Sequence, residues 1–485
     1  MARVASWLRL DAVILLGWLL YFAYAASAPL SDPDTPWHLA TGAWILAHHH
    51  VPTHDPFSWS MRGQPWVTQE WLFEVVLAWC AHHFGFPGVY GILVGLQTLT
   101  VWFVYRLCLH LSRGNAVFSA IAAALAVAAG MPFWVVRPQL VSYMMFALFL
   151  LLLERVRRGS TGYAFLLIPL TLVWANAHAS VSIGIAMILF EVLVSFLPTI
   201  GRFQGQPLPM RTRALLIAIA AACVGVGLLN PNGIHEFTYA LLSNNALMVN
   251  SINEWHSPNF HSEYYKYGVI PFLMLIALVA IARSRKLPWK YVLYFFACFA
   301  LTLVYQRFMP YLAIAGAPLI ALLSFDWLRV LLRPRPVLRF VWLAAMLGEI
   351  VDFGLRMPSI GGPVSAHMNP NAYPVAAVDY LKSHSIPGPL LNAYDFGGYL
   401  IYRGVPTFVD GRTDIYLRSG VFANYMDLQN LAPDAPALLQ QYHFQSAILP
   451  PGYSLTTYLE NNPNWTLVYS DNVADIFVRN ASTTG

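Results

Sequence analysis

The sequence predicts a polytopic α-helical membrane protein with about eleven transmembrane helices and a C-terminal soluble α/β domain. The first observation is composition: 58% of the 485 residues are hydrophobic and 11% are charged, whereas soluble domains carry about 25% charged residues. The second is the length of the apolar segments, which suits helices rather than strands. The third is a regular alternation of basic connections. Since a backbone persists in lipid only as helices or a closed barrel, these segments are expected to be spanning helices.

The predicted spans are separated by connections that alternate in charge. They lie near residues 10–28, 87–108, 115–131, 139–154, 162–178, 180–199, 213–230, 267–283, 288–305, 308–325 and 336–353. Six basic clusters occupy every second connection: Arg3/Arg9, Arg106/Arg113, Arg155/Arg157/Arg158, Arg202/Arg211/Arg213, Arg283/Arg285/Lys286/Lys290 and Arg329/Arg333/Arg335/Arg339. The positive-inside rule then makes the N-terminus cytoplasmic and puts residues 29–86, 131–138, 230–266 and the tail on the outer face.

Hydropathy falls after about Phe353, which divides the chain. We expect a transmembrane domain over 1–355, with a long first outer loop at 29–86, and an extracytoplasmic α/β domain over 356–485. In the tail, short apolar runs at 389–391, 407–409, 447–449, 467–469 and 475–478 alternate with helical patterns at 376–383 and 435–442. Such alternation is typical of small α/β domains. The apolar but short segment 70–81 is expected to be a helix in the interface or packed on the bundle.

The first outer loop concentrates acids, histidines and tryptophans. Asp32, Asp34 and His38 begin it, and Asp55 and Glu70 follow. A carboxylate above a membrane cavity can coordinate a divalent cation or act as a general base. The alternative is a helix cap by Asp32 or Asp34 for a helix over 37–47, which is the favoured interpretation of an isolated Asp-Pro-Asp.

Further candidates lie at the outer ends of predicted spans. Glu254 belongs to an outer loop, with His256 two residues later, and Arg307 and Arg137 sit beside spans. An arginine there suits a phosphate, which it grips bidentately; the alternatives are a solvated loop acid and interfacial snorkelling.

Two polar residues end the fifth predicted span, and one acid lies within the sixth. Asn176 and His178 either line the cavity or pair with each other. Glu191 is expected to be a buried structural partner, because a charge at membrane depth needs one.

Two tail segments follow predicted strands and are rich in polar groups. The candidate residues there are Tyr394, Asp395, Asp410, Arg412, Asp414 and Tyr416. Loops at the carboxyl ends of strands are common binding positions in α/β sheets. The alternative is turn chemistry, since Asp-Gly and Gly-Gly pairs form turns without another role.

In order, these stretches resemble one family. Asp32-Pro33-Asp34-Thr35-Pro36-Trp37-His38, Ser251-Ile252-Asn253-Glu254, Arg307-Phe308-Met309-Pro310 and Tyr394-Asp395-Phe396-Gly397 look like the motifs of a GT-C superfamily glycosyltransferase, nearest to the catalytic subunit of oligosaccharyltransferase. The second acidic pair of that family has no counterpart in residues 131–138. Its two acceptor-motif tryptophans are Ala393 and Tyr394 here.

The resemblance implies roles for the candidate residues. Asp34 would activate the acceptor or, with Glu254, hold Mg²⁺ or Mn²⁺ if a cation is bound. Asp32 would be the alternative residue for the role of Asp34, and His38 would assist the reaction. Arg307, with Arg137, would bind the donor phosphate. The loops bearing Tyr394, Asp395, Asp410, Arg412, Asp414 and Tyr416 would bind the acceptor or close the cavity.

The expected activity is transfer of a sugar or oligosaccharide from a polyprenyl-phosphate or polyprenyl-pyrophosphate carrier. The acceptor would be a glycan or a protein on the outer face of a bacterial inner membrane. The partners are then the lipid-linked donor, membrane lipids and the acceptor, with no nucleic acid. The alternatives are a transporter and a non-catalytic partner of cell-envelope polysaccharide machinery with the same fold.

Overall fold

The computed structural model describes residues 10–25, 27–242, 245–282, 286–322 and 336–480. The chain divides into two compact units. We call residues 1–27, 90–240 and 252–360 the bundle unit, and residues 28–89, 241–251 and 361–485 the α/β unit. The long loop after the first predicted span therefore packs with the tail of the chain rather than with the helices that follow it.

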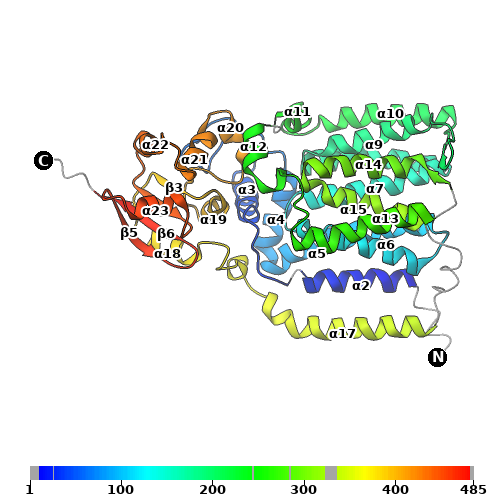
Figure 1. Ribbon diagram of the computed structural model, residues 1–485, viewed down its shortest axis with the longest axis horizontal. Coiled ribbons are helices and arrows are strands. Elements are labelled where there is room, and N and C mark those ends of the chain that lie inside the picture. Colours follow the sequence, from blue (N-terminus) through cyan, green and yellow to red (C-terminus); the bar gives the residue numbers. More distant parts are fainter. Residues whose placement is uncertain (1–9, 26, 243–244, 283–285, 323–335, 481–485) are drawn as a thin grey trace. The chain divides into compact units, whose positions relative to one another are not determined.

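Long helices lying side by side make up the bundle unit (Figure 1). They are α2 (Leu10–Ala25), α5 (Phe86–Leu111), which begins in the α/β unit, α6 (Ala116–Ala129), α7 (Gln139–Arg157), α8 (Leu167–Ala177), α9 (Val181–Val194), α10 (Met210–Gly227), α13 (Ile270–Ala282), α14 (Trp289–Val304), α15 (Met309–Leu322) and α17 (Pro336–Ile360). Short elements connect them: η1 (Met131–Phe133), η2 (Thr161–Leu166), η3 (Asn253–Trp255), the π-helix η4 (Tyr265–Val269), η5 (Gln306–Phe308) and strands β1 (Phe203–Gln204) and β2 (Leu287–Pro288). Helix α11 (His235–Leu242) follows α10.

Each predicted span coincides with a helix among the described residues. Three helices, α5, α7 and α10, are long and apolar enough to cross a membrane by length and composition. The number of crossings stays a prediction. The basic residues at 3, 9, 283, 285, 329, 333 and 335 lie outside the described part of the chain.

A buried ion network joins three bundle helices. Glu191 of α9 pairs with Arg157 at 2.6 Å and with Lys290 at 2.6 Å, and Lys290 also lies 3.4 Å from Glu154. These side chains are almost completely buried. Charges at this depth persist only when paired, so the interpretation of Glu191 as a buried structural partner is confirmed.

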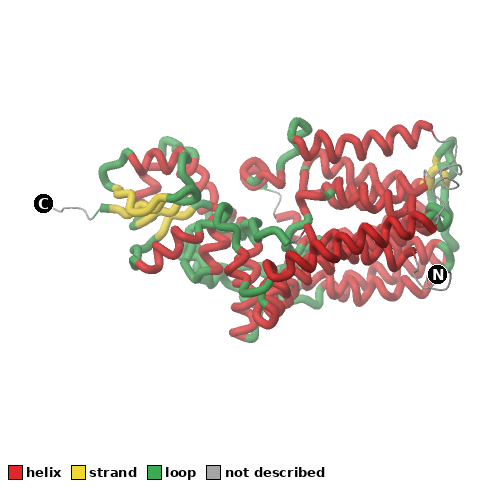
Figure 2. The backbone as a smooth tube through the Cα atoms, turned by 90° about the horizontal axis from the view of Figure 1, so that it is seen from below, coloured by secondary structure: helices red, strands yellow, loops and turns green. Residues whose placement is uncertain are grey.

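The tail forms a four-stranded mixed sheet with the order β3-β4-β6-β5 (strands in Figure 2). Strand β3 (Leu390–Asn392) runs parallel to β4 (Ser446–Leu449), and β6 (Asp475–Arg479) runs antiparallel to both β4 and β5 (Trp465–Ser470). The other elements of the α/β unit are α3 (Thr35–His48), α4 (Trp71–Phe84), α12 (Ala246–Ser251), η6 (Val364–His367), α18 (Val375–Ser383), η7 (Tyr394–Phe396), α19 (Gly397–Tyr402), α20 (Thr413–Leu417), α21 (Val421–Gln429), α22 (Ala435–Gln441) and α23 (Ser454–Glu460).

The predicted strand at 407–409 is wrong. Thr407 makes only an isolated bridge with Ser58. Side chains occupy the backbone groups that a neighbouring strand would use: the Phe408 N–H donates to Asn392 Oδ1 at 2.7 Å, and the Val409 carbonyl accepts from Asn392 Nδ2 at 2.8 Å. Because buried backbone groups need one partner each, the asparagine replaces a strand here.

Candidate functional site

A cluster of one acid and two arginines lies in the bundle unit. Arg137 Nη1 is 3.2 Å from Glu254 Oε2, and Arg307 Nη1 is 3.7 Å from Glu254 Oε1. The Arg307 guanidinium also lies over the Trp255 ring, 4.4 Å from its centre. The side chains are partly exposed: 16% for Arg137, 23% for Arg307 and 31% for Glu254. Two guanidiniums against one carboxylate leave a net positive charge at a surface that a ligand can reach.

Short non-helical segments position this cluster. Glu254 belongs to η3 and Arg307 to η5, and Gln306 ties the two segments together by donating from its backbone N–H to the His256 carbonyl at 2.9 Å. His256 itself is exposed. Burial raises the pKa of Glu254, but Arg307 and Arg137 outweigh it and hold this pKa below its usual range. Glu254 is therefore anionic at neutral pH.

Asn176 and His178 anchor the end of α8. Asn176 Nδ2 donates to the Leu172 and Leu229 carbonyls at 2.8 and 3.1 Å. His178 Nδ1 lies 2.9 Å from Ser142 Oγ and 2.8 Å from Ser180 Oγ. A role of either residue in lining a cavity stays a prediction.

In the α/β unit, Asp32 caps the start of α3. Its Oδ1 accepts the backbone N–H groups of Asp34 at 3.0 Å and Thr35 at 3.1 Å. The capping alternative therefore holds for Asp32. The Asp34 side chain is not used as a cap; its Oδ1 accepts from the Trp37 indole at 3.1 Å.

Glycines from the tail approach Asp34 and its neighbours. A Cβ on Gly411 would lie 2.0 Å from Asp34 Oδ1, and one on Gly398 would lie 2.1 Å from the Pro33 carbonyl oxygen. A Cβ on Gly397 would be 2.5 Å from the Asp410 Cβ. Both tail motifs thus contain glycine because they pack against the Asp-Pro-Asp segment. Turn formation was the alternative role expected for these glycines, and their contact with the Asp-Pro-Asp segment was not predicted.

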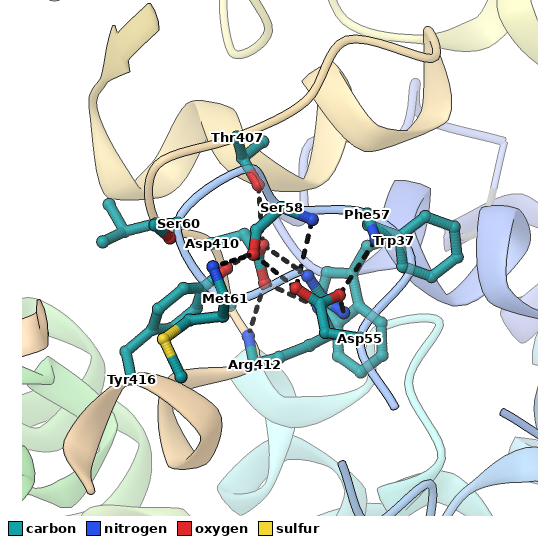
Figure 3. A network of polar contacts seen from close by, with 12 residues as sticks. Trp37, Asp55, Phe57, Ser58, Ser60, Met61, Thr407, Asp410, Arg412 and Tyr416 are labelled. Atoms are coloured by element: carbon teal, nitrogen blue, oxygen red, sulfur yellow. Dashed lines mark hydrogen bonds and ion pairs between the residues drawn. The ribbon is translucent and has the colours of Figure 1, made fainter. Parts of the chain in front are cut away.

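A second network surrounds Arg412, shown in Figure 3. Its Nη1 lies 2.6 Å from Asp55 Oδ1 and its Nη2 lies 2.8 Å from Asp410 Oδ2. Tyr416 donates its hydroxyl to Asp410 at 2.5 Å, and Ser58 bonds to Asp55. All of these side chains are buried. The network closes residues 55–61 onto residues 407–416.

Arg412 sets the ionisation of this network. Burial alone raises the pKa of Asp410, but the Arg412 guanidinium and the hydrogen bonds from Arg412 and Tyr416 hold the pKa of that carboxyl below its usual range. Burial raises the pKa of the Tyr416 hydroxyl, and the Asp410 charge raises it further. Asp410 is thus anionic and Tyr416 neutral.

The six residues expected at the acceptor or lid separate into two groups. Asp410, Arg412 and Tyr416 are buried and bind one another, which gives them a structural role in the loop. Tyr394, Asp395 and Asp414 are half-buried or exposed, and the Tyr394 hydroxyl lies 2.5 Å from Thr413 Oγ1. Acceptor contact stays a prediction, and these three residues are its better-placed candidates.

A buried histidine and two glutamates meet between α3 and α4. His38 Nδ1 is 3.0 Å from Glu74 Oε1 and 3.7 Å from Glu70 Oε2. One ligand atom from each residue lies within 4.8 Å of the others, so the group could hold a divalent cation. His38 and Glu70 were among the predicted site residues, whereas Glu74 was not. The available signal was the spacing of Glu70 and Glu74, since residues four apart share one face of a helix.

Solved structures with this fold were found, although no family model and no curated protein matches the sequence. The archaeal oligosaccharyltransferase AglB from Archaeoglobus fulgidus, in complex with an inhibitory peptide and a dolichol-phosphate, is 12% identical with a TM-score of 0.52; the match covers 89% of this chain and 69% of AglB. ArnT from Cupriavidus metallidurans bound to undecaprenyl phosphate is 12% identical with a TM-score of 0.52, over 98% of both chains.

The chain has the GT-C fold. Its likeness to ArnT in the apo state, at 13% identity and a TM-score of 0.52, extends over 100% of both chains. The GT-C resemblance derived from the motifs is therefore confirmed at the level of the fold.

The predicted residues gather in two places of the chain. Glu254, Arg137 and Arg307 meet in the bundle unit. Asp34 meets the tail at Gly411 in the α/β unit, where Asp32 and His38 also lie. Asp34 and Glu254 belong to different units, so their meeting in one pocket stays a prediction.

Proposed function

We propose that this protein is a membrane glycosyltransferase that uses a polyprenyl-phosphate-linked or polyprenyl-pyrophosphate-linked sugar or oligosaccharide. The acceptor is a glycan or a protein on the outer face of a bacterial inner membrane, with the N-terminus cytoplasmic. The GT-C fold supports this class of reaction. AglB and ArnT were solved with dolichol-phosphate and undecaprenyl phosphate, respectively.

The observation that carries the proposal is the Arg137–Glu254–Arg307 cluster. Its two guanidiniums are held in place by one carboxylate and stay partly exposed. Arginine binds phosphate oxygens bidentately and remains charged at every physiological pH. A preorganised cation of this kind stabilises the charge that develops on a leaving phosphate. The cluster therefore supports binding of a phosphate at this surface.

The reaction is a displacement at the anomeric carbon. A bond forms from an acceptor oxygen or nitrogen to the anomeric carbon, and the bond from that carbon to the phosphate oxygen breaks. Asp34 accepts the acceptor proton as general base. Arg307 and Arg137 stabilise the phosphate that leaves on the polyprenyl carrier.

We assign no cation to Glu254. Its carboxylate already faces two guanidiniums, and their charge repels a divalent cation and attracts an anion. Of the two expected metal ligands, Asp34 and Glu254, only Asp34 keeps a carboxylate suited to that role or to base catalysis. Glu254 instead orients the arginines.

The first experiment measures binding of the lipid phosphate. The full-length protein in nanodiscs is titrated with undecaprenyl phosphate, and uncharged undecaprenol is the control lipid. We expect Arg307→Gln and Arg137→Gln each to weaken phosphate binding by about tenfold or more, since a charge-assisted hydrogen bond contributes about 1.5–3 kcal/mol. The exposed Arg211→Gln should bind as the wild type does. Equal binding of the phosphate and the alcohol would contradict the proposal.

A second candidate function is a non-catalytic partner with the same fold. The absence of an acid from residues 131–138 favours it. In that case the protein binds the lipid phosphate but transfers no sugar from a lipid-linked donor library to any acceptor fraction, and Asp34→Asn changes nothing. Turnover that is lost in Asp34→Asn supports the enzyme instead.

A further inference from the structure

We propose that His38, Glu70 and Glu74 form a binding site for one divalent transition-metal cation of the Zn²⁺ type. The site lies inside the α/β unit, between α3 and α4. It is separate from the arginine cluster of the bundle unit, and it does not depend on the proposed glycosyl transfer.

The positions of the ligand atoms fit one small cation. A zinc ion bound at about 2.0–2.2 Å places its ligands roughly 3.4 Å apart in a tetrahedral arrangement. His38 Nδ1 lies 3.0 Å from Glu74 Oε1 and 3.7 Å from Glu70 Oε2, on either side of that spacing. Three protein ligands leave a fourth position for water, as in open zinc sites.

The backbone holds these ligands close together. A Cβ on Gly42, one turn after His38 on α3, would lie 1.9 Å from the Glu74 carbonyl oxygen of α4. The two helices therefore touch at Gly42, and His38 faces the first turn of α4. Glu70 and Glu74 are four residues apart, so both carboxylates lie on one side of that helix.

An unpartnered buried oxygen supplies the independent evidence for a ligand. The Glu74 side chain is 1% exposed, yet its Oε2 has no hydrogen-bond partner among the described residues. Such an atom is costly to bury. The other oxygen of this carboxylate faces His38, so the unpartnered atom belongs to the group that points at the cluster.

The charge balance also favours a cation. The site brings two buried carboxylates together beside one imidazole. The Arg412 guanidinium acts on the Glu74 carboxylate, but it already pairs with Asp55 and Asp410. Buried carboxylates are normally paired with a cation or coordinate a metal. A divalent cation neutralises both.

The ligand types indicate the class of metal. Imidazole suits Zn²⁺, Cu²⁺, Fe²⁺ and Ni²⁺, whereas Ca²⁺ and Mg²⁺ prefer oxygen ligands alone. Histidine nitrogens and carboxylate oxygens are both ligands that Zn²⁺ takes in proteins. The bound cation would join the first turn of α3, which begins beside Asp34, to the first turn of α4.

The test measures metal binding by the full-length protein in detergent, without an affinity tag. The exposed residues His48, His49 and His50 are first replaced by glutamine, because short histidine-rich tracts are able to bind metals themselves. After chelator treatment, the protein is titrated with Zn²⁺ and with Co²⁺, whose visible absorption reports the ligand geometry. Bound metal is counted by mass spectrometry, and thermal unfolding is followed with and without Zn²⁺.

We expect one equivalent of bound metal and a higher Tm with Zn²⁺, because a ligand that binds only the folded state stabilises it. Glu74→Gln and Glu70→Gln should each weaken binding at least tenfold. The exposed Glu460→Gln should bind as the parent does. Folded parent protein that binds no metal, or that binds it unchanged after Glu74→Gln, would overturn the proposal. If neither glutamine variant folds, the Zn²⁺-dependent Tm of the parent decides: no rise refutes the site.

Discussion

At the scale of single residues, Arg412 determines the charge state of the α/β interior. It is one buried guanidinium between two buried aspartates, and it also lies over the rings of Phe57 and Trp66. Buried ion pairs contribute little when compared with an apolar replacement, but breaking one leaves a charge without compensation. Single substitutions here are therefore expected to be severe.

Asp410→Asn removes one of the two charges that Arg412 needs. We expect the free energy of unfolding to fall by about 3–5 kcal/mol, the usual cost of breaking a buried pair. Asp379→Asn is the matched control, because its pair with Arg403 is exposed and such pairs contribute about 0–1 kcal/mol. Denaturant unfolding measures both. A loss equal to that of the control would show that Arg412 does not depend on Asp410.

The same carboxyl gives stability a defined pH dependence. The folded-state pKa of Asp410 is lowered, so the unfolded chain binds more protons than the folded one as the pH falls. The contribution is fully present above the ordinary aspartate pKa of about 3.9 and is lost as the pH falls through the lowered value. Asp410→Asn should flatten the acid limb of a Tm-against-pH curve. An unchanged acid limb would contradict this assignment.

Residue types and positions in the sequence predicted part of the candidate site. Glu254, Arg137 and Arg307 were predicted because a charged side chain beside a membrane span is costly and usually has a function. The structure brings the three residues together. Glu74 was not predicted, because it lies in an apolar segment whose partner, His38, is 36 residues away. Pattern reasoning sees spacing along one helix and does not see which face of another helix it meets.

At the scale of elements, close approach decides how α3 and α4 pack. Glycine at position 42 permits a contact that no other residue would permit, because a Cβ at this position would overlap the Glu74 backbone. Hydropathy predicted a helix at 70–81, and the capping alternative named one at 37–47; the structure has them at Trp71–Phe84 and Thr35–His48. Hydropathy could not predict that α19 packs against the start of α3 through Gly398.

Gly42→Ala is expected to separate these helices. The added methyl group meets backbone rather than a movable side chain. The free energy of unfolding should therefore fall by at least about 1–3 kcal/mol, as in an overpacked core. Gly91→Ala in α5 is the control: nothing lies within 4 Å of its Cβ, and alanine favours a helix. Thermal unfolding of both variants decides, and equal Tm values would contradict the close contact.

At the scale of the whole molecule, the chain builds one unit from both of its ends. Residues 28–89 pack with residues 361–485. Hydropathy separated the apolar bundle from the polar tail because composition changes there, but the partner of a polar loop is set by contacts such as Asp55 with Arg412, 357 positions apart. Composition carries no information about such pairs.

Arg412→Lys tests whether the Arg412 side chain holds the first loop and the tail together. Lysine lacks the planar fork that serves Asp55 and Asp410 together. We expect hydrogen exchange to rise at once in peptides covering residues 54–64 and 405–418. Arg403→Lys, whose partner Asp379 is 61% exposed, should leave both peptides protected. Exchange that rises in one peptide alone would show that the two segments are held independently.

The link between Asp55 and Arg412 also constrains the order of biosynthesis. Asp55 leaves the ribosome early, and its guanidinium partner is made only after the helices between them. During that interval the Asp55 carboxylate lacks the Arg412 guanidinium, and the Asp-Pro-Asp segment lacks its contacts with Gly398 and Gly411. This unit is thus completed only after Arg412 has been made, and a nascent chain released before residue 412 lacks the ion pair that holds the first loop to the tail.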